Sequence, residues 1–93
     1  MTVSFLIPRP LRSMTGGHSR VDVETLGGTL RDALEALFAA HPAIRDRVFT
    51  EQGEIREHVN VFVGNTVARW TGGLATPVAD GVEISIIPAI SGG

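Results

Sequence analysis

The residues of this sequence best suited to chemistry lie at its C-terminal end, which finishes with Gly92 and Gly93. Because glycine has no Cβ atom, a Gly-Gly segment is flexible and slim enough to thread into a narrow cleft of a partner protein. The only reactive group at this end is the α-carboxylate of Gly93, a poor electrophile that must be activated before it can accept a nucleophile. A frayed terminus or a cloning remnant is the competing interpretation, since chain ends are commonly disordered.

The stretch before the two glycines favours presentation of the terminus over fraying. Apolar residues at positions 82, 84 and 86 alternate with polar residues at 83 and 85, and this period of two predicts a half-buried β-strand. Pro88 has no N–H group to donate, so we expect strand pairing to weaken there. From Pro88 onward the tail could reach roughly 20 Å if extended. The tail residues that would thread into a partner are Pro88, Ala89, Ile90, Ser91 and Gly92.

The composition is that of one small globular domain. A length of 93 residues suits a single domain, and the apolar fraction of 43% and charged fraction of 19% are ordinary for a soluble protein. The net charge of −2 gives no reason to expect a nucleic-acid or anionic-membrane partner. The apolar runs are too short to span a membrane, and the start of the chain does not resemble a signal peptide. We therefore expect a cytoplasmic protein and, from its small size, a monomer.

Few side chains are candidates for catalysis or metal binding. The sequence has no cysteine, which excludes disulfides, thiol nucleophiles and zinc–cysteine sites. His18, His41 and His58 lack the spacing of metal ligands. All eight basic residues are arginine, so no side-chain amine is offered to an activated acyl group, although genome composition is the simpler explanation. We expect neither a metal site nor a catalytic residue, and interpret the protein as a non-enzyme.

Alternating patterns divide the rest of the chain into further strands. They predict strands over residues 2–7, 21–24 and 59–63, and a short one over 67–70 after a tight turn at Gly64-Asn65. Residues 8–19 are expected to be a loop, which makes the first two strands a hairpin unless the first strand continues to about residue 11. A long segment over 71–81 then ends in an Asp-Gly turn and leads into the last strand.

One helix is predicted over residues 30–40, where apolar residues recur at helical spacing and form one face. Thr29 is a suitable N-cap, and Asp32 three residues later completes a pattern like a capping box. Pro42 marks the end of the helix. Residues 43–49 are expected to form either a short second helix or a turn.

The element order β-β-α-β-β-β predicts an α+β protein with one sheet and one main helix. The helix can bury its apolar stripe only against the sheet, so we expect it to cover one sheet face. Leu6, Phe62 and Trp70 are expected on the opposite face. If exposed, they would form a contact surface for a partner protein; coverage by loops is the alternative.

Several segments together match a known family. The main match is the glycine-rich segment 71–81 with its Asp-Gly turn, followed by 84–93 with the last strand, the proline and the terminal Gly-Gly. Smaller matches are Ile7-Pro8, Leu11-Arg12, Thr15-Gly16-Gly17 and Asn60-Val61. Together they resemble the ubiquitin-like sulfur carriers of the MoaD/ThiS family, and most closely the CysO type of actinobacterial cysteine biosynthesis. The resemblance implies a β-grasp domain over 1–87, with a mixed sheet of about five strands on one helix, and a flexible tail over 88–93.

The resemblance also implies a carrier whose chemistry is done at Gly93 by partner enzymes. An E1-like enzyme would use ATP to adenylate the Gly93 carboxylate, and a sulfur donor would displace AMP to leave a thiocarboxylate. In the cysteine route, the sulfur would add to an aminoacrylate held on pyridoxal phosphate by a CysM-type cysteine synthase. A zinc-dependent hydrolase of the JAMM type would then release the cysteine. ATP, pyridoxal phosphate and zinc would thus be bound by partners, and no cofactor by this chain.

Three alternatives stay open. The first is a sulfur carrier for molybdopterin, thiamine or another sulfur-containing metabolite. The second is a ubiquitin-like modifier that is conjugated to lysines of other proteins. The third is a β-grasp interaction module whose terminus does not react.

Overall fold

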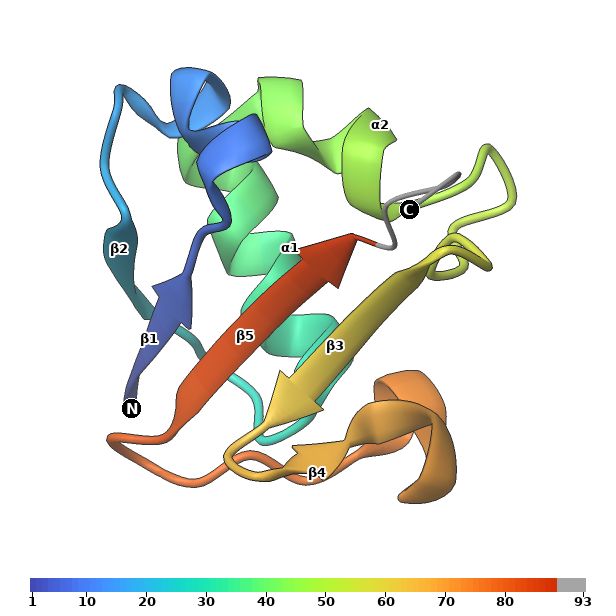
Figure 1. Cartoon of the computed structure of the whole chain (residues 1–93). Helices are drawn as coiled ribbons and strands as arrows, with labels where there is room; N and C mark the ends of the chain where they lie inside the picture. Colours follow the sequence, from blue (N-terminus) through green and yellow to red (C-terminus); the bar gives the residue numbers. More distant parts are fainter. Residues whose placement is uncertain (89–93) are drawn as a thin grey trace.

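The computed structural model describes residues 1–88 as one sheet with helices packed against it (Figure 1). In chain order, its strands and α-helices are β1 (Thr2–Leu6), β2 (Arg20–Glu24), α1 (Leu30–Ala40), α2 (Arg45–Val48), β3 (Val59–Val63), β4 (Thr66–Val67) and β5 (Glu83–Pro88). Short 3-10 helices lie between them: η1 (Arg9–Thr15), η2 (Pro42–Ile44), η3 (Ala68–Trp70) and η4 (Gly73–Ala75). None of the described helices has the length and apolarity that crossing a bilayer requires.

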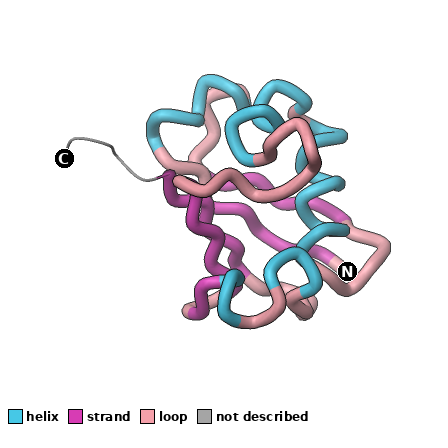
Figure 2. Tube along the Cα trace, turned by 90° about the vertical axis from the view of Figure 1, so that its right-hand side faces the viewer, coloured by secondary structure: helices cyan, strands magenta, loops and turns pink. Residues whose placement is uncertain are grey.

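The five strands form one mixed sheet in the order β2-β1-β5-β3-β4. β5 runs parallel to β1 and antiparallel to β3, while the β1–β2 and β3–β4 pairs are antiparallel. α1 crosses one face of this sheet (Figures 1 and 2). A mixed five-stranded sheet packed on one main helix is the ubiquitin-like β-grasp fold, as the family resemblance implies.

α1 begins and ends at the predicted residues. Asp32 N donates to Thr29 Oγ1 at 3.3 Å and Thr29 N donates to Asp32 Oδ2 at 3.2 Å, so the pair forms a capping box. The side of α1 that faces the sheet is buried; its members are Leu30, Ala33, Leu34, Leu37 and Phe38. Of the two alternatives for residues 43–49, the structure has the short helix, α2.

β5 is the central strand, and its burial follows the predicted alternation. Ile84 and Ile86 are 0% and 1% exposed on the side of α1, whereas Ile87 on the other face is 47% exposed. β5 is paired on both edges, with Phe5 of β1 opposite Ile84 and Val61 of β3 opposite Ile86. The strand that leads into the C-terminal tail is therefore held by two neighbouring strands and by the core.

The prediction of a simple loop over residues 8–19 is wrong, because residues 9–15 form η1 and bury Leu11 and Thr15. Pro8 precedes this helix and Pro10 lies in its first turn, where a proline is tolerated because its missing N–H group would be unpaired in any case. The side chain of Leu11 joins the main core. The connection between β1 and β2 is thus a packed element.

The predicted strand over residues 67–70 is also wrong beyond Val67, because Ala68–Trp70 form η3. The carbonyl oxygen of Ala68 accepts hydrogen bonds from Thr71 N at 2.9 Å and from the hydroxyls of Thr71 and Thr76 at 3.2 and 3.3 Å. These local bonds occupy a carbonyl that a longer strand would use in the sheet. The chain turns away after two residues of β4.

Replacing Ile86 with alanine tests the burial pattern of β5. Ile86→Ala should lower the free energy of unfolding by about 2–5 kcal/mol, since it leaves a cavity in the core. The matched variant Ile87→Ala, one residue further along the strand, should lower it by about 1 kcal/mol or less. Chemical denaturation of the two variants measures both values, and equal losses would show that the strand register is wrong.

Candidate functional site

The tail predicted to react starts at the end of β5. Pro88 is the last residue of this strand and lies opposite Val59 of β3. Proline is compatible with a strand end, where its missing N–H group removes no further ladder bond. The end of β5 lies at one rim of the sheet (Figures 1 and 2). The other predicted tail residues, Ala89, Ile90, Ser91, Gly92 and Gly93, lie outside the described residues, so their roles stay predictions.

The sheet face opposite α1, called here the open face, carries an apolar patch. Leu6 of β1 lies opposite Ser85 of β5, which in turn lies opposite Phe62 of β3, so these side chains form one row across the strands. Ile87 has the same phase as Ser85 in β5 and therefore belongs to this face. The apolar patch consists of Leu6, Phe62, Trp70 and Ile87.

Trp70 and Phe62 line a shallow groove at one side of the apolar patch. The groove has a volume of about 430 Å³, and its other walls are Asn60, Asn65, Thr66, Val67 and Arg69. The side chain of Trp70 is 81% exposed, which is unusual for the largest aromatic residue. The structure therefore brings Phe62 and Trp70 together in one groove and places Leu6 in the same row as Phe62, across Ser85. A role of these residues in partner contact stays a prediction.

Ile87 is the member of the patch that sequence reasoning missed. The sequence did contain a signal. Ile87 has the same phase as Glu83 and Ser85 in the alternating pattern, so it lies on the face opposite Ile86. An isoleucine at a position that faces water is a candidate for contact with another protein.

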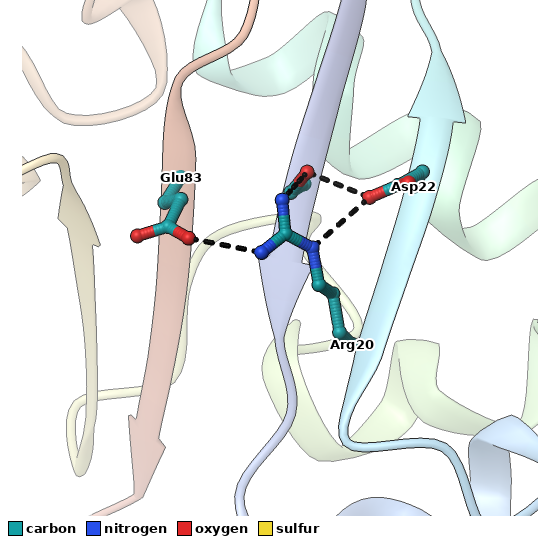
Figure 3. Close-up of polar contacts among 4 residues, drawn as sticks. Arg20, Asp22 and Glu83 are labelled. Carbon is teal, nitrogen blue, oxygen red and sulfur yellow. Dashed lines mark hydrogen bonds and ion pairs between the residues drawn. The ribbon is translucent and has the colours of Figure 1, made fainter.

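The open face is polar beside the apolar patch, where one arginine connects three strands (Figure 3). Arg20 of β2 donates from Nη1 to Glu83 Oε2 at 3.2 Å in β5 and from Nη2 to Ser4 Oγ at 3.0 Å in β1. The Ser4 hydroxyl donates to Asp22 Oδ1 at 2.6 Å. This hydrogen bond is the main reason why the pKa of Asp22 lies below its ordinary value. Desolvation raises the pKa against it, and the hydrogen bond and charge of Arg20 lower the pKa further.

The side chains that could ligate a metal are dispersed in the part of the chain from Met1 to Pro88. No group of three or more His, Asp or Glu side chains there is placed to hold a metal ion. His18, His41 and His58 belong to three separate segments, after η1, after α1 and before β3.

Comparison with known proteins places the chain in a family. The family model described as "ThiS family" matches residues 5–93, and the chain belongs to this family. The sulfur carrier protein CysO of Mycobacterium tuberculosis is 37% identical over the full length of both chains. Small archaeal modifier protein 1 of Haloferax volcanii is 42% identical over 80% of this chain and 79% of its own. Among solved structures, the Amycolatopsis orientalis BexX/CysO complex aligns with a TM-score of 0.87 and 34% identity, covering 98% of this chain and 99% of that chain.

Asp22→Asn tests the polar network by its dependence on pH. The folded-state pKa of Asp22 lies below the ordinary value of 3.8. The ionised carboxylate therefore contributes its full stabilisation at pH values above 3.8. This contribution is lost as the pH falls through the lower folded-state pKa. In urea denaturation, the variant should be less stable than the parent at neutral pH, and the difference should shrink in strong acid. A difference that stays constant through the acid range would contradict the assignment.

Proposed function

We propose that this protein is a sulfur carrier whose reactive group is the Gly93 carboxylate. The observation that carries the proposal is the placement of β5, which is fixed in the middle of the sheet and ends at its rim only five residues before Gly93. Such a placement gives a short tail a rigid origin, while its terminal glycines suit a narrow enzyme cleft. The family membership and the full-length similarity to a sulfur carrier support the same role.

The chemistry at Gly93 would take two steps in an E1-like partner. The carboxylate would attack the α-phosphorus of ATP, which releases pyrophosphate and leaves an acyl adenylate. Hydrosulfide, or a donor equivalent to it, would then attack the acyl carbon and displace AMP. The product is a thiocarboxylate, which is ionised at neutral pH and has a polarisable sulfur, so it is a good nucleophile. The chain itself acts as a co-substrate in this scheme.

The acceptor that we favour is the one used in cysteine biosynthesis. A pyridoxal-phosphate-dependent synthase of the CysM type would hold an aminoacrylate, and the thiocarboxylate sulfur would add to it. After an acyl shift, a zinc-dependent hydrolase of the JAMM type would release cysteine and restore the Gly93 carboxylate. The support for this acceptor is the similarity to CysO. Molybdopterin or thiamine synthesis would use the same thiocarboxylate, and the identity of the acceptor distinguishes these routes.

A second function, protein modification, is favoured by one specific observation. The chain is 42% identical to a protein named small archaeal modifier protein 1. A modifier would use the same adenylate, but a lysine amine of another protein would displace AMP and form an isopeptide bond. Adducts on lysines of cell proteins would support this second function, and the two functions are compatible in one chain.

The apolar patch is the surface that we assign to docking of the activating enzyme. Phe62 and Trp70 are aromatic residues, the class that most often dominates binding energy in protein interfaces. The patch covers the same open face that β5 crosses before its end at Pro88. An enzyme that rests on the patch can therefore receive Ala89, Ile90, Ser91 and Gly92 in a channel that leads to its ATP site.

The terminus is tested by removing or extending it. A chain that lacks Gly93, or that carries one extra residue after it, should fold normally but gain no sulfur. The assay is the intact mass after incubation with ATP, a sulfide source and lysate of the host, where the parent chain should exchange one oxygen for sulfur. Sulfur gain by either variant would disprove the role of Gly93, provided that circular dichroism shows all chains to be folded.

The docking surface is tested by truncating Trp70. Trp70→Ala should weaken binding to the activating enzyme by about tenfold or more, the effect of losing an aromatic anchor. Leu26→Ala is the matched control, because Leu26 is another fully exposed apolar residue but lies outside the apolar patch. Binding measured by calorimetry with both variants separates a specific contact from general loss of apolar surface. Equal affinities of the two variants would rule Trp70 out as an anchor.

A further inference from the structure

A second hollow, called here the β3 groove, lies along the outer edge of β3. β3 pairs with β4 only through Phe62 and Val63, so no described strand pairs with the outer edge of its first half. The groove has a volume of about 400 Å³, within the usual range of ligand pockets, roughly 300–1,000 Å³. Its apolar walls are Ile55, Val59, Val61, Val67, Ala68, Gly73 and Leu74.

Charged side chains surround these apolar walls. Arg31, Arg56 and Arg69 line the groove, together with Glu54 and Glu57. The ion pairs found between Met1 and Pro88 involve only the N-terminal amine and Arg20, so none of the three groove arginines is paired with a carboxylate there. Arg56 Nε donates to the carbonyl of Asp46 at 2.7 Å, and Arg69 Nη2 donates to Asn60 Oδ1. Because an arginine has five N–H donors, each of these two keeps further donors for an anion. The β3 groove therefore suits a ligand with one apolar group and one negative charge.

The origin of the C-terminal tail lies directly beside this groove. Pro88 is opposite Val59, which lines the groove, and neighbouring strands are only about 4.8 Å apart. The five residues after Pro88 could span roughly 17 Å if extended. They include one large apolar side chain, that of Ile90, and one charge, the α-carboxylate of Gly93. These are the two features for which the groove is suited.

We propose that residues 89–93 dock in the β3 groove of their own chain when no partner is bound. In this state Ile90 contacts the apolar walls and the Gly93 carboxylate accepts hydrogen bonds from the groove arginines. Arg56 is attached to the part of β3 beside the tail origin, because its carbonyl accepts a hydrogen bond from Val59 N at 3.0 Å and Val59 lies opposite Pro88. The docked tail keeps the reactive carboxylate on the carrier surface until an enzyme withdraws it.

Weak contacts are sufficient for this docking, because the tail belongs to the same chain as the groove. A short flexible linker gives an effective concentration on the order of 1 mM, so a dissociation constant near 1 mM already fills about half of the grooves. A half-docked tail lowers the apparent affinity of a competing partner by only about twofold. Docking of this strength would therefore protect the terminus without blocking its use.

The proposal is tested by comparing nuclear magnetic resonance spectra of the full chain and of a chain that ends at Pro88. Removal of residues 89–93 should shift the amide signals of Ile55 and Leu74 and the side-chain Nε–H signals of the groove arginines. These shifts should not depend on protein concentration. Changes confined to Ile87, Pro88 and their strand neighbours would overturn the proposal. Shifts that grow with concentration would also overturn it, because they would indicate docking between two copies.

Two further comparisons isolate the carboxylate and the arginines. Added to the chain that ends at Pro88, the peptide Ala-Ile-Ser-Gly-Gly should shift the same signals with a dissociation constant in the millimolar range, and its C-terminal amide should bind several-fold more weakly. In the full chain, Arg56→Gln should reduce the tail-dependent shifts, whereas the control Arg9→Gln, at an exposed arginine outside the groove, should not. Equal binding of acid and amide would exclude a role for the carboxylate. None of these readouts depends on sulfur loading, so this proposal and the proposed function can fail separately.

Discussion

The pairing of β5 on both of its edges is the interaction on which the rest of the structure depends. A C-terminal strand at the edge of a sheet could fray, but β5 lies between β1 and β3 and buries Ile84 and Ile86 in the core. Opening it would break two sets of ladder bonds and expose the main apolar cluster, so its end is as well fixed as the fold itself. A short tail that continues from such a strand has a defined origin. In the proposed function, this defined origin is what allows the chain to act through its last residue.

The two faces of the sheet divide structural and contact roles. α1 covers one face of the sheet (Figure 2) and completes the core. The residues of opposite phase therefore lie on the open face. There, apolar side chains gather toward β3 and η3, while the network of Arg20, Asp22, Ser4 and Glu83 connects β2, β1 and β5 (Figure 3). The network stabilises the surface without hiding the apolar patch. The β3 groove adds a third environment at the sheet edge, next to the origin of the C-terminal tail.

Most of the fold could be predicted from the sequence, because the spacing of apolar residues that determines each element repeats along the chain. The alternation in β1, β2, β3 and β5 and the helical spacing in α1 record directly which side of each element is buried. Neither η1 nor η3 could be predicted from these patterns. η3 depends on hydroxyls of Thr71 and Thr76 that reach one carbonyl only after the chain has turned. Leu6, Phe62 and Trp70 were predictable as surface candidates, whereas Ile87 was not selected because it adjoins the buried Ile86. The β3 groove has no sequence signature, since its walls come from segments far apart in the chain.

The location of the transferred sulfur tests the central claim most directly. The chain would be loaded with isotopically heavy sulfide in the presence of ATP and its activating enzyme, and then cleaved with trypsin. Because the last arginine is Arg69, the peptide of residues 70–93 is released intact. The account predicts that the heavy sulfur is found in this peptide and, after fragmentation, at Gly93 in place of one carboxylate oxygen. Heavy sulfur found only at other positions, or none in a reaction that loads a known carrier, would contradict it.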